Sequence, residues 1–374
     1  MKLAKGIQVE FKIRKNDFLR GLRLAQGIAD RKNTMPILAN VLLRADGKGG
    51  LLVAATDLNV SVSANLAVTA DKEGGLTVGA KPLHDIVANL PGDELTIKST
   101  ESNQADIRAG KVEYKLVGMP DRDFPKMPDH REMKFSKVDG AVLRDMIDKT
   151  LFSVSNDETR FHLNGVLFEC DGARARMVST DGHRLSKAES TLTGGPQLAS
   201  GVIIPRKGLS EIKRLLDAMQ ADCEMAVHGT NLFLRGGDTV LAVKLIDASY
   251  PPYDQVIPKG NDKTAIVECK AFLEALRRAS LMSSETRGFR LTLSEGTLQI
   301  AGDNPELGEV KEEIAAVYTG AAFSTGFNPR YFVDLITQID GDRVRMDFAG
   351  ELDPALLRPE DSTDYIGVIM PMRI

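Results

Sequence analysis

One short segment of the sequence carries residue types that could do chemistry together. Residues 180–185 read Thr-Asp-Gly-His-Arg-Leu, which places the carboxylate of Asp181, the imidazole of His183 and the guanidinium of Arg184 within four residues. An enzyme could use the Asp–His pair as a general base and the arginine to hold an anionic substrate. The same letters also fit a tight turn, in which Gly182 takes a left-handed conformation and His183 and Arg184 begin the next strand.

The common signatures of enzyme and metal sites are absent from the sequence. It has no GxxxxGK[ST] phosphate loop, no HExxH zinc motif and no GxSxG nucleophile turn. Its five histidines are dispersed, and Cys170, Cys223 and Cys269 are too far apart to form a CxxC pair. We therefore expect no cofactor and no metal, and a catalytic interpretation depends on residues 181–184 alone.

The composition limits the class of protein. The 374 residues include 48 Lys and Arg against 52 Asp and Glu, for a net charge of −4, and 43% are hydrophobic. These values exclude a disordered chain and a protein that holds DNA by bulk positive charge. The longest apolar runs, at 201–205 and 366–372, fall short of the ~20 residues that cross a bilayer. With no signal-peptide core at the N-terminus either, we expect a cytoplasmic protein.

The sequence contains one internal repeat. A strand-turn-strand pattern occurs three times, with Asp57, Asp181 and Asp303 at the turns, 124 and 122 residues apart. The first and third copies lack the His-Arg pair, so the repeat favours a turn at residues 180–185 over a catalytic site. A period of this length is far longer than a solenoid repeat, and the repeated unit is therefore a whole domain.

Each copy predicts the same elements in the same order. Apolar residues at helical spacing indicate a first helix in each copy, within 18–25, 142–151 and 272–279. Short strands with period-2 alternation follow. A second helix is expected at 82–90, 208–219 and 329–339. Each copy is therefore an α+β unit with two helices and mostly antiparallel strands.

Two polar, proline-bearing linkers separate the copies. They lie near 126–134 and 258–263, and such segments are typical of domain boundaries. We therefore expect three domains, at residues 1–130, 131–260 and 261–374.

Two further features favour binding over catalysis. Residues 365–374 are apolar almost to the last residue, which suggests a final strand whose Met370 and Met372 offer an adaptable surface to a partner. Basic residues recur on the predicted helices of all three copies, as at Arg23, Lys149 and Arg277. They are either ordinary solvated side chains or one positive surface that holds nucleic acid without reading its sequence.

Together these residues resemble the bacterial DNA polymerase III beta subunit, the sliding clamp family. The resemblance covers the whole chain and depends on the threefold repeat, on STDGHRL at 179–185 and on the ending VIMPMR at 368–373. The segments MPILAN at 35–40, LNGVLFE at 163–169 and IIPRKG at 203–208 also look like family motifs.

The resemblance implies a fold and a function. The fold is three tandem copies of a two-helix, antiparallel-sheet DNA-clamp domain, which form a head-to-tail homodimeric ring around duplex DNA. Such a ring is not an enzyme and needs no cofactor, because it confers processivity on the replicative polymerase by tethering it. The alternatives are a non-ring three-domain scaffold and an enzyme that uses Asp181, His183 and Arg184.

The resemblance also implies partners and a location. The partners are a second copy of the chain, double-stranded DNA encircled without sequence preference, and the replicative polymerase. The clamp loader, repair polymerases, ligase and mismatch-repair proteins join them through Leu/Phe-type linear motifs. The location is cytoplasmic and nucleoid-associated, with no membrane contact.

Three sets of site residues follow from the resemblance. The partner-peptide pocket takes Leu163, Thr180, Gly182, His183, Arg184, Leu185, Pro251, Val256, Asn328, Tyr331, Leu352, Pro354, Val368, Ile369, Met370, Pro371, Met372 and Arg373. The DNA-binding set is Arg31, Lys32, Phe161, His162, Arg206 and Lys207. The dimer interface takes Arg108, Lys111, Tyr114, Leu281, Met282, Glu306, Glu309 and Glu312. The first set brings the 180–185 turn and the apolar ending into one groove.

Overall fold

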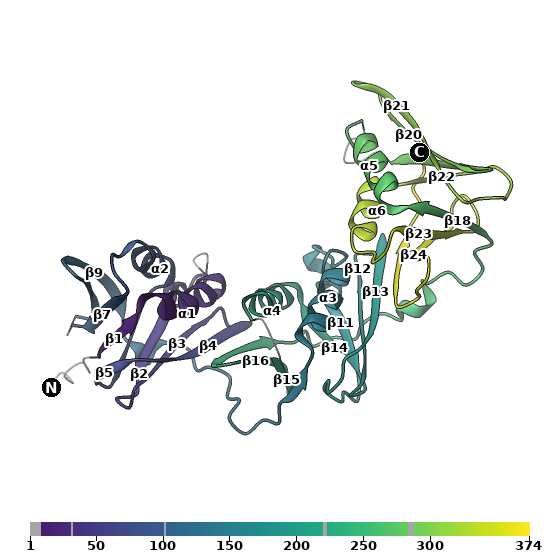
Figure 1. Cartoon of the computed structure of the whole chain (residues 1–374). Coiled ribbons are helices and arrows are strands. Elements are labelled where there is room, and N and C mark those ends of the chain that lie inside the picture. The colour runs from purple at the N-terminus through teal and green to yellow at the C-terminus, as the bar shows by residue number, and fades with distance from the viewer. Residues whose placement is uncertain (1–8, 31–32, 101, 220–222, 283–287) are drawn as a thin grey trace. The chain divides into compact units, whose positions relative to one another are not determined.

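The computed structural model describes residues 9–30, 33–100, 102–219, 223–282 and 288–374 (Figure 1). It divides into two compact units. The first unit comprises residues up to 140 together with 207–245, and the second comprises 141–206 together with 246–374. The second copy of the sequence repeat therefore contributes to both units.

Where the structure describes it, the first unit is one antiparallel sheet with three α-helices. The sheet has the strand order β10-β15-β16-β17-β4-β3-β2-β6-β9-β8-β7-β1-β5. The helices are α1 (Lys15–Ile28), α2 (Ala80–Asn89) and α4 (Arg206–Ala218). The strands are β1 (Glu10–Arg14), β2 (Asn40–Ala45), β3 (Gly50–Thr56), β4 (Val60–Ala67), β5 (Thr69–Lys72), β6 (Gly74–Gly79), β7 (Glu94–Ser99), β8 (Gln104–Ala109), β9 (Val112–Met119), β10 (Ser136–Val138), β15 (Cys223–His228), β16 (Asn231–Gly236) and β17 (Thr239–Lys244).

The described residues of the second unit form two antiparallel sheets and three α-helices. Their strand orders are β14-β11-β12-β13-β25-β24-β23-β18 and β21-β20-β19-β22. The helices are α3 (Gly140–Leu151), α5 (Cys269–Ser280) and α6 (Pro329–Ile336). The strands are β11 (Gly165–Cys170), β12 (Arg174–Thr180), β13 (Arg184–Thr191), β14 (Val202–Pro205), β18 (Lys263–Glu268), β19 (Phe289–Ser294), β20 (Thr297–Asn304), β21 (Gly308–Ala315), β22 (Phe323–Phe327), β23 (Arg343–Phe348), β24 (Ala355–Pro359) and β25 (Tyr365–Ile369).

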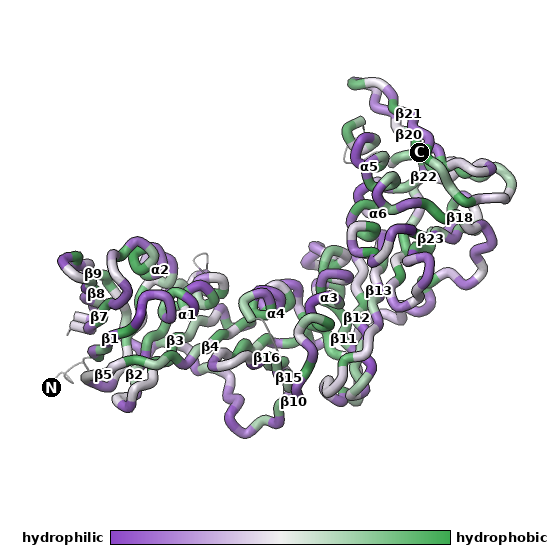
Figure 2. The backbone as a smooth tube through the Cα atoms, viewed as in Figure 1, coloured by the Kyte–Doolittle hydropathy of each residue, from purple (hydrophilic) through white to green (hydrophobic). Residues whose placement is uncertain are grey.

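The helices form where the apolar spacing predicts them. In α1 the buried positions include Phe18, Leu22 and Ala25, which share one face of the helix and pack toward α2 and the sheet. In the second unit Phe332 of α6 meets Phe272 of α5 with ring centroids 5.9 Å apart. Figure 2 colours the chain by hydropathy and shows that the linker between β9 and β10 is largely hydrophilic.

The predicted end of the last helix is wrong. The pattern predicts a helix to residue 339, whereas α6 ends at Ile336. Gln338 and Ile339 donate their backbone N–H groups to carbonyls only three residues back, so the chain tightens into a turn.

The repeated turns are confirmed in two copies and shifted in the third. Asp57 Oδ1 accepts the backbone N–H of Asn59 at 2.9 Å and thereby closes the β3–β4 turn. In the third copy Asp303 lies inside β20, and Asn304 takes this role by accepting from the N–H of Glu306 at 3.0 Å. The expectation of Asp303 at the turn is therefore wrong by one residue.

Both units contain a sheet that continues from one repeat into the next. In the first unit β4 pairs with β17, with Val60 opposite Val243. In the second unit β13 pairs with β25, with Leu185 opposite Val368. The second pairing brings the 180–185 turn and the apolar ending of the sequence together.

Candidate peptide-binding site

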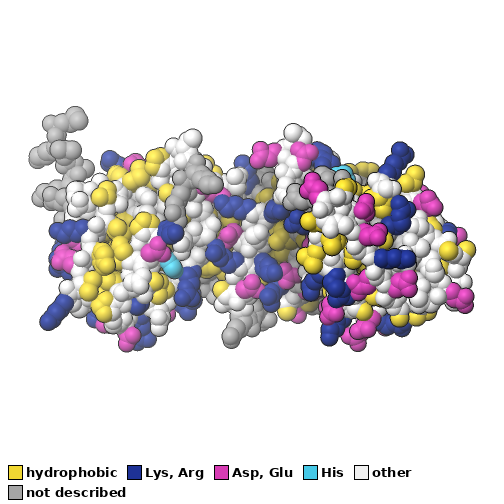
Figure 3. Space-filling model, turned by 90° about the horizontal axis from the view of Figure 1, so that it is seen from above, with side chains coloured by type: hydrophobic (Ala, Val, Ile, Leu, Met, Phe, Trp, Pro, Cys, Tyr) yellow, Lys and Arg dark blue, Asp and Glu magenta, His cyan; other side chains and the backbone are white. Residues whose placement is uncertain are grey.

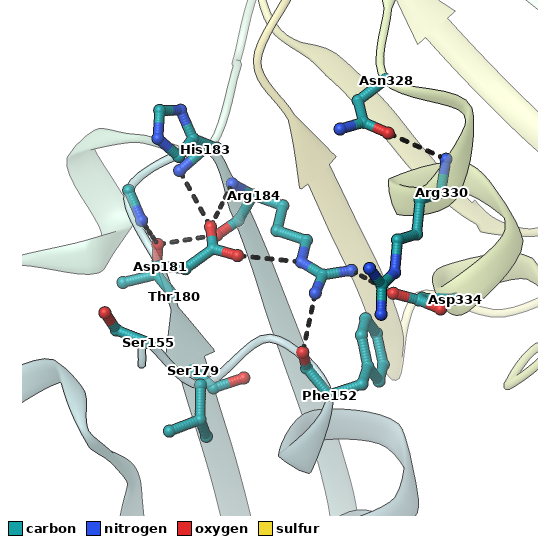
Figure 4. Close-up of polar contacts among 12 residues, drawn as sticks. Phe152, Ser155, Ser179, Thr180, Asp181, His183, Arg184, Asn328, Arg330 and Asp334 are labelled. Carbon is teal, nitrogen blue, oxygen red and sulfur yellow. Dashed lines mark hydrogen bonds and ion pairs between the residues drawn. The ribbon is translucent and has the colours of Figure 1, made fainter. Parts of the chain in front are cut away.

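The 180–185 segment is a capped turn between β12 and β13. Asp181 Oδ1 accepts the backbone N–H groups of His183 at 2.9 Å and Arg184 at 3.0 Å (Figure 4). Gly182 has a φ of +91°, which a residue with a side chain rarely adopts. The turn interpretation is therefore confirmed, and Asp181 acts as a side-chain cap of the turn.

The side chain of Arg184 connects the second and third repeats. Its Nε donates to Asp181 Oδ2 at 3.0 Å, and its two terminal nitrogens donate to Asp334 Oδ2 at 2.6 Å and to the carbonyl of Phe152 at 2.8 Å. The guanidinium also lies 4.6 Å from the ring centroid of Tyr331. Only 10% of the side chain is exposed. A buried guanidinium with three acceptors and an aromatic neighbour holds α6 against the turn.

The partners of Arg184 give its removal a large expected effect. Arg184→Ala would leave the half-buried carboxylates of Asp181 and Asp334 without their cation, and we expect a loss of about 3 kcal/mol in the free energy of unfolding. Urea denaturation followed by circular dichroism measures it. The control is Arg174→Ala, on the neighbouring strand, whose side chain is exposed and should change stability by less than about 0.5 kcal/mol. Equal effects of the two variants would contradict a stabilising connection through Arg184.

Beneath the turn lies a small apolar cluster on one face of the sheet. Leu185 and Val368 are buried in it with Val178 and Tyr253. Because Leu185 is 2% and Val368 1% exposed, these side chains form the floor of the site and offer little free surface. Their place in the predicted pocket stays a prediction, and the free surface for a peptide lies on the residues around them.

The exposed apolar residues lie around this floor. Val256 is 40% and Leu352 60% exposed, so neither side chain is part of the core. Val256 and Pro354 line a groove of about 620 Å³ with Ile257 and Asn261. The groove is open and mainly apolar, which suits a short peptide.

Tyr253 fixes the segment that carries Val256. Its hydroxyl donates to Glu169 Oε2 at 2.9 Å and accepts from Arg176 at 2.9 Å. Burial, reinforced by the Glu169 carboxylate, raises the pKa of Tyr253 to about 12. The phenol therefore stays neutral and hydrogen-bonded, and the chain from 251 to 256 is held against the sheet. The sequence did not predict this contact among Glu169, Arg176 and Tyr253, because the three residues are scattered along the chain and no local pattern connects them.

The predicted pocket residues fall into six places in the second unit. The turn carries Thr180, Gly182, His183, Arg184 and Leu185, and Leu163 ends the short helix that precedes β11. Pro251 and Val256 flank Tyr253 in the linker. Asn328 and Tyr331 belong to the start of α6, where the Asn328 side chain accepts from the N–H of Arg330 at 3.0 Å. Leu352 and Pro354 lie between β23 and β24, and Val368, Ile369, Met370, Pro371, Met372 and Arg373 form β25 and the tail.

The predicted DNA-binding residues are only partly described. Arg31 and Lys32 lie outside the described residues. Phe161 is 55% exposed and packs edge-on against the His162 ring, with centroids 5.9 Å apart. Arg206 donates to the carbonyl of Val154, and Lys207 donates to Asp57. The view from above shows Lys and Arg side chains in several groups among Asp and Glu (Figure 3).

The predicted dimer residues lie at two sheet edges. The first half of β9 pairs with β8 alone, and β21 is the outer strand of its sheet. Tyr114 on β9 is 43% exposed, and Leu281 just after α5 is 76% exposed. Two of the predicted interface residues already form ion pairs within the chain. Arg108 pairs with Glu113, and Glu312 pairs with Arg278.

Metal-ligand clusters and membrane-spanning helices are both absent from the described residues. No group of three or more His, Cys, Asp or Glu side chains in this part of the chain could hold a metal ion. No helix among the same residues is long and apolar enough to span a membrane.

Comparison with known proteins places the chain in a family. Models of the DNA polymerase III beta subunit match its N-terminal domain at residues 9–128, its central domain at 137–252 and its C-terminal domain at 254–373. The beta sliding clamps of Pseudomonas aeruginosa and Escherichia coli are each 33% identical to the chain, over 98% of this chain and 100% of theirs. A crystal structure of the Caulobacter crescentus sliding clamp superposes with a TM-score of 0.94 at 32% identity, over 99% of this chain and 100% of that one.

The fold and these matches define a DNA sliding clamp of replication, built from three clamp domains. The chain belongs to the DNA polymerase III beta subunit family.

Proposed function

We propose that two copies of this chain close head to tail into a ring of six domains around duplex DNA. The domains are residues 1–130, 131–260 and 261–374, and the polymerase held by the ring stays on its template. The observation that carries the proposal is the full-length match to sliding clamps, together with the three two-helix repeats. The ring acts as a tether and performs no catalysis.

Two strand segments that each pair on one side support the way in which the ring closes. In unit one the first half of β9 pairs with β8 alone and has Arg108, Lys111 and Tyr114 nearby. In unit two β21 is the outer strand of its sheet and carries Glu309 and acidic neighbours. Unpaired edges of opposite charge can extend one sheet into the other. Leu281 and Met282 would meet Tyr114 at the apolar centre. The acidic set Glu306, Glu309 and Glu312 would face the basic residues at the rim.

DNA contact in this proposal is weak and independent of sequence. Arg31, Lys32, Phe161, His162, Arg206 and Lys207 are the proposed contacts. Arg206 and Lys207 already have acceptors within the chain, so each phosphate contact would compete with an existing bond. That competition fits a protein that slides along DNA and does not grip it.

The peptide site serves several partners through one groove. The proposed occupants are Leu/Phe-type linear motifs of the replicative polymerase, the clamp loader, repair polymerases, ligase and mismatch-repair proteins. The open groove beside Val256 and Pro354 and the apolar tail support this role. The proposed location is the cytoplasm, at the nucleoid.

Retention on circular DNA tests the proposed function. After loading by a clamp loader with ATP, the protein should stay on a nicked circle through gel filtration and leave when a restriction enzyme linearises the DNA. Direct binding to a linear duplex should fall by a factor of ten or more when salt rises from about 50 to 200 mM, because it depends on phosphate contacts. Retention on the circle should survive the same salt, because topology holds the ring.

Two outcomes would contradict the ring. Equal loss from circular and linear DNA would show binding by affinity and not by topology. A native mass equal to one chain at micromolar concentration would favour the three-domain scaffold. The enzyme alternative has lost its main support, because Asp181 caps the turn and binds Arg184.

A further inference from the structure

The last residues of the sequence cross from one sheet of the second unit to another. The backbone N–H of Met370 donates to the carbonyl of His183 at 2.9 Å, next to β13. Two residues later, the N–H of Met372 donates to the carbonyl of Gly326 at 2.7 Å. Gly326 belongs to β22, which is the outer strand of its sheet. The tail is therefore fastened at two points, and residues 370–372 bridge them.

Beyond Met372, the side chain of Ile374 lies over backbone that has no side chain to oppose it. A Cβ on Gly326 would lie 2.5 Å from Ile374 Cδ1 and 2.6 Å from the carbonyl oxygen of Met372. A Cβ on Gly288 would lie 3.2 Å from Ile374 Cγ2. Arg290, which pairs with Gly326 across β19 and β22, donates to the Ile374 carbonyl at 3.3 Å.

The two glycines are explained by space and not by backbone conformation. Neither Gly288 nor Gly326 has a positive φ, so an alanine could adopt the same backbone. A glycine inside a strand weakens it and often marks the close approach of another segment. At Gly326, inside β22, the approaching segment is the tail. Gly288 lies just before β19, and a Cβ there would meet the Phe327 carbonyl oxygen at 2.7 Å as well as the tail at 3.2 Å. We call Gly288 and Gly326 the glycine slot.

We infer that Ile374 is a latch: its seating in the glycine slot positions Met370 and Met372 within the proposed peptide site. The inference depends on the proposed peptide site and adds positioning residues to it, namely Gly326, Gly288 and Ile374. Without the slot, Met372 would lose its bond to Gly326, and the tail would be held at Met370 alone. A peptide would then have to order the tail as it binds, and its affinity would fall.

Gly326→Ala and Ile374→Ala test the latch from its two sides. Hydrogen exchange should become at least about tenfold faster at the Met372 amide in both variants, while core amides of β19 keep their rates. Calorimetry with a peptide that carries Leu and Phe anchors should show affinity reduced about tenfold. The double variant should bind no more weakly than Gly326→Ala alone, because both changes remove the same contact.

Gly302→Ala is the matched control. Gly302 is buried in β20 of the same sheet, and its Cβ would meet Val310 at 3.3 Å and not the tail. It should leave Met372 exchange and peptide affinity unchanged. Faster tail exchange with unchanged affinity would overturn the latch as a support of the peptide site. Unchanged exchange in Ile374→Ala would also overturn it, because Ile374 is half-exposed and its replacement does not threaten folding. If the unaltered protein fails to bind the peptide, the proposed pocket fails, whereas the exchange rates still report whether the tail is seated.

Discussion

Replacing Leu281 and Met282 by aspartate is expected to leave the protein monomeric. Leu281 is 76% exposed at the end of α5 and is therefore available to a partner. Two carboxylates at the centre of an apolar interface would be buried without cations, at a cost of several kcal/mol each. The dimer dissociation constant should rise by at least about a thousandfold, which corresponds to about 4 kcal/mol. Light scattering at micromolar concentration measures the change.

Leu58→Asp is the matched control for this experiment. Leu58 is 51% exposed and lies at the β3–β4 turn with a φ of +78°, where aspartate is tolerated better than leucine. It is not among the proposed interface residues, so the variant should remain a dimer. A dimer that persists in both proteins would place the interface away from Leu281. The same monomeric variant should also fall off nicked circles, since one chain cannot close a ring.

The helices and turns could be predicted because their signals are local. Apolar spacing of three and four residues placed α1, α3 and α5 within a few residues of their observed ranges, and an Asp-Gly pair was enough to predict the turn at 181. The turn of the third repeat could not be placed as well, because Asp303 and Asn304 are adjacent and either can cap a turn. The structure selects Asn304, whose side chain faces the N–H of Glu306.

The side-chain contacts between repeats could not be predicted. Arg184 and Asp334 are 150 residues apart in the chain, and no periodicity connects a strand residue to a helix residue in another repeat. The resemblance to the family located Arg184 at the site, but it suggested contact with a peptide. The structure shows a guanidinium already engaged by three acceptors, so its direct contact with a peptide stays a prediction.

The repeat itself explains why an apolar floor forms between the second and third copies. Ser61 on β4 is opposite Ala242 of β17, whereas Leu185 on β13 is opposite Val368 of β25. The strand pairing is the same, but a serine and an alanine replace a leucine and a valine. At the first junction these positions are therefore filled by smaller side chains, and Ala242 belongs to a separate apolar cluster with Phe233, whereas at the second junction Leu185 and Val368 share one cluster.

Removing residues 370–374 is expected to abolish peptide binding while the ring stays intact. The deletion spares β25, whose pairing with β13 ends at Ile369, so the junction of the second and third repeats keeps its sheet. It removes Met370 and Met372, two flexible apolar side chains of the proposed peptide site. A peptide with Leu and Phe anchors should bind the intact protein with micromolar affinity, about −8 kcal/mol, and the truncated protein at least about a hundredfold more weakly.

Calorimetry on intact and truncated dimers measures this difference, and light scattering confirms that both are dimers. Val256→Ala should show a smaller loss of about tenfold, because it removes two methyl groups from the groove, worth about 0.8 kcal/mol each. The polymerase should lose stimulation in proportion to the peptide affinity of each variant, since both readouts depend on the same site. Unchanged affinity after truncation would place the peptide site elsewhere, and the proximity of the 180–185 turn to the apolar tail would then reflect strand pairing alone.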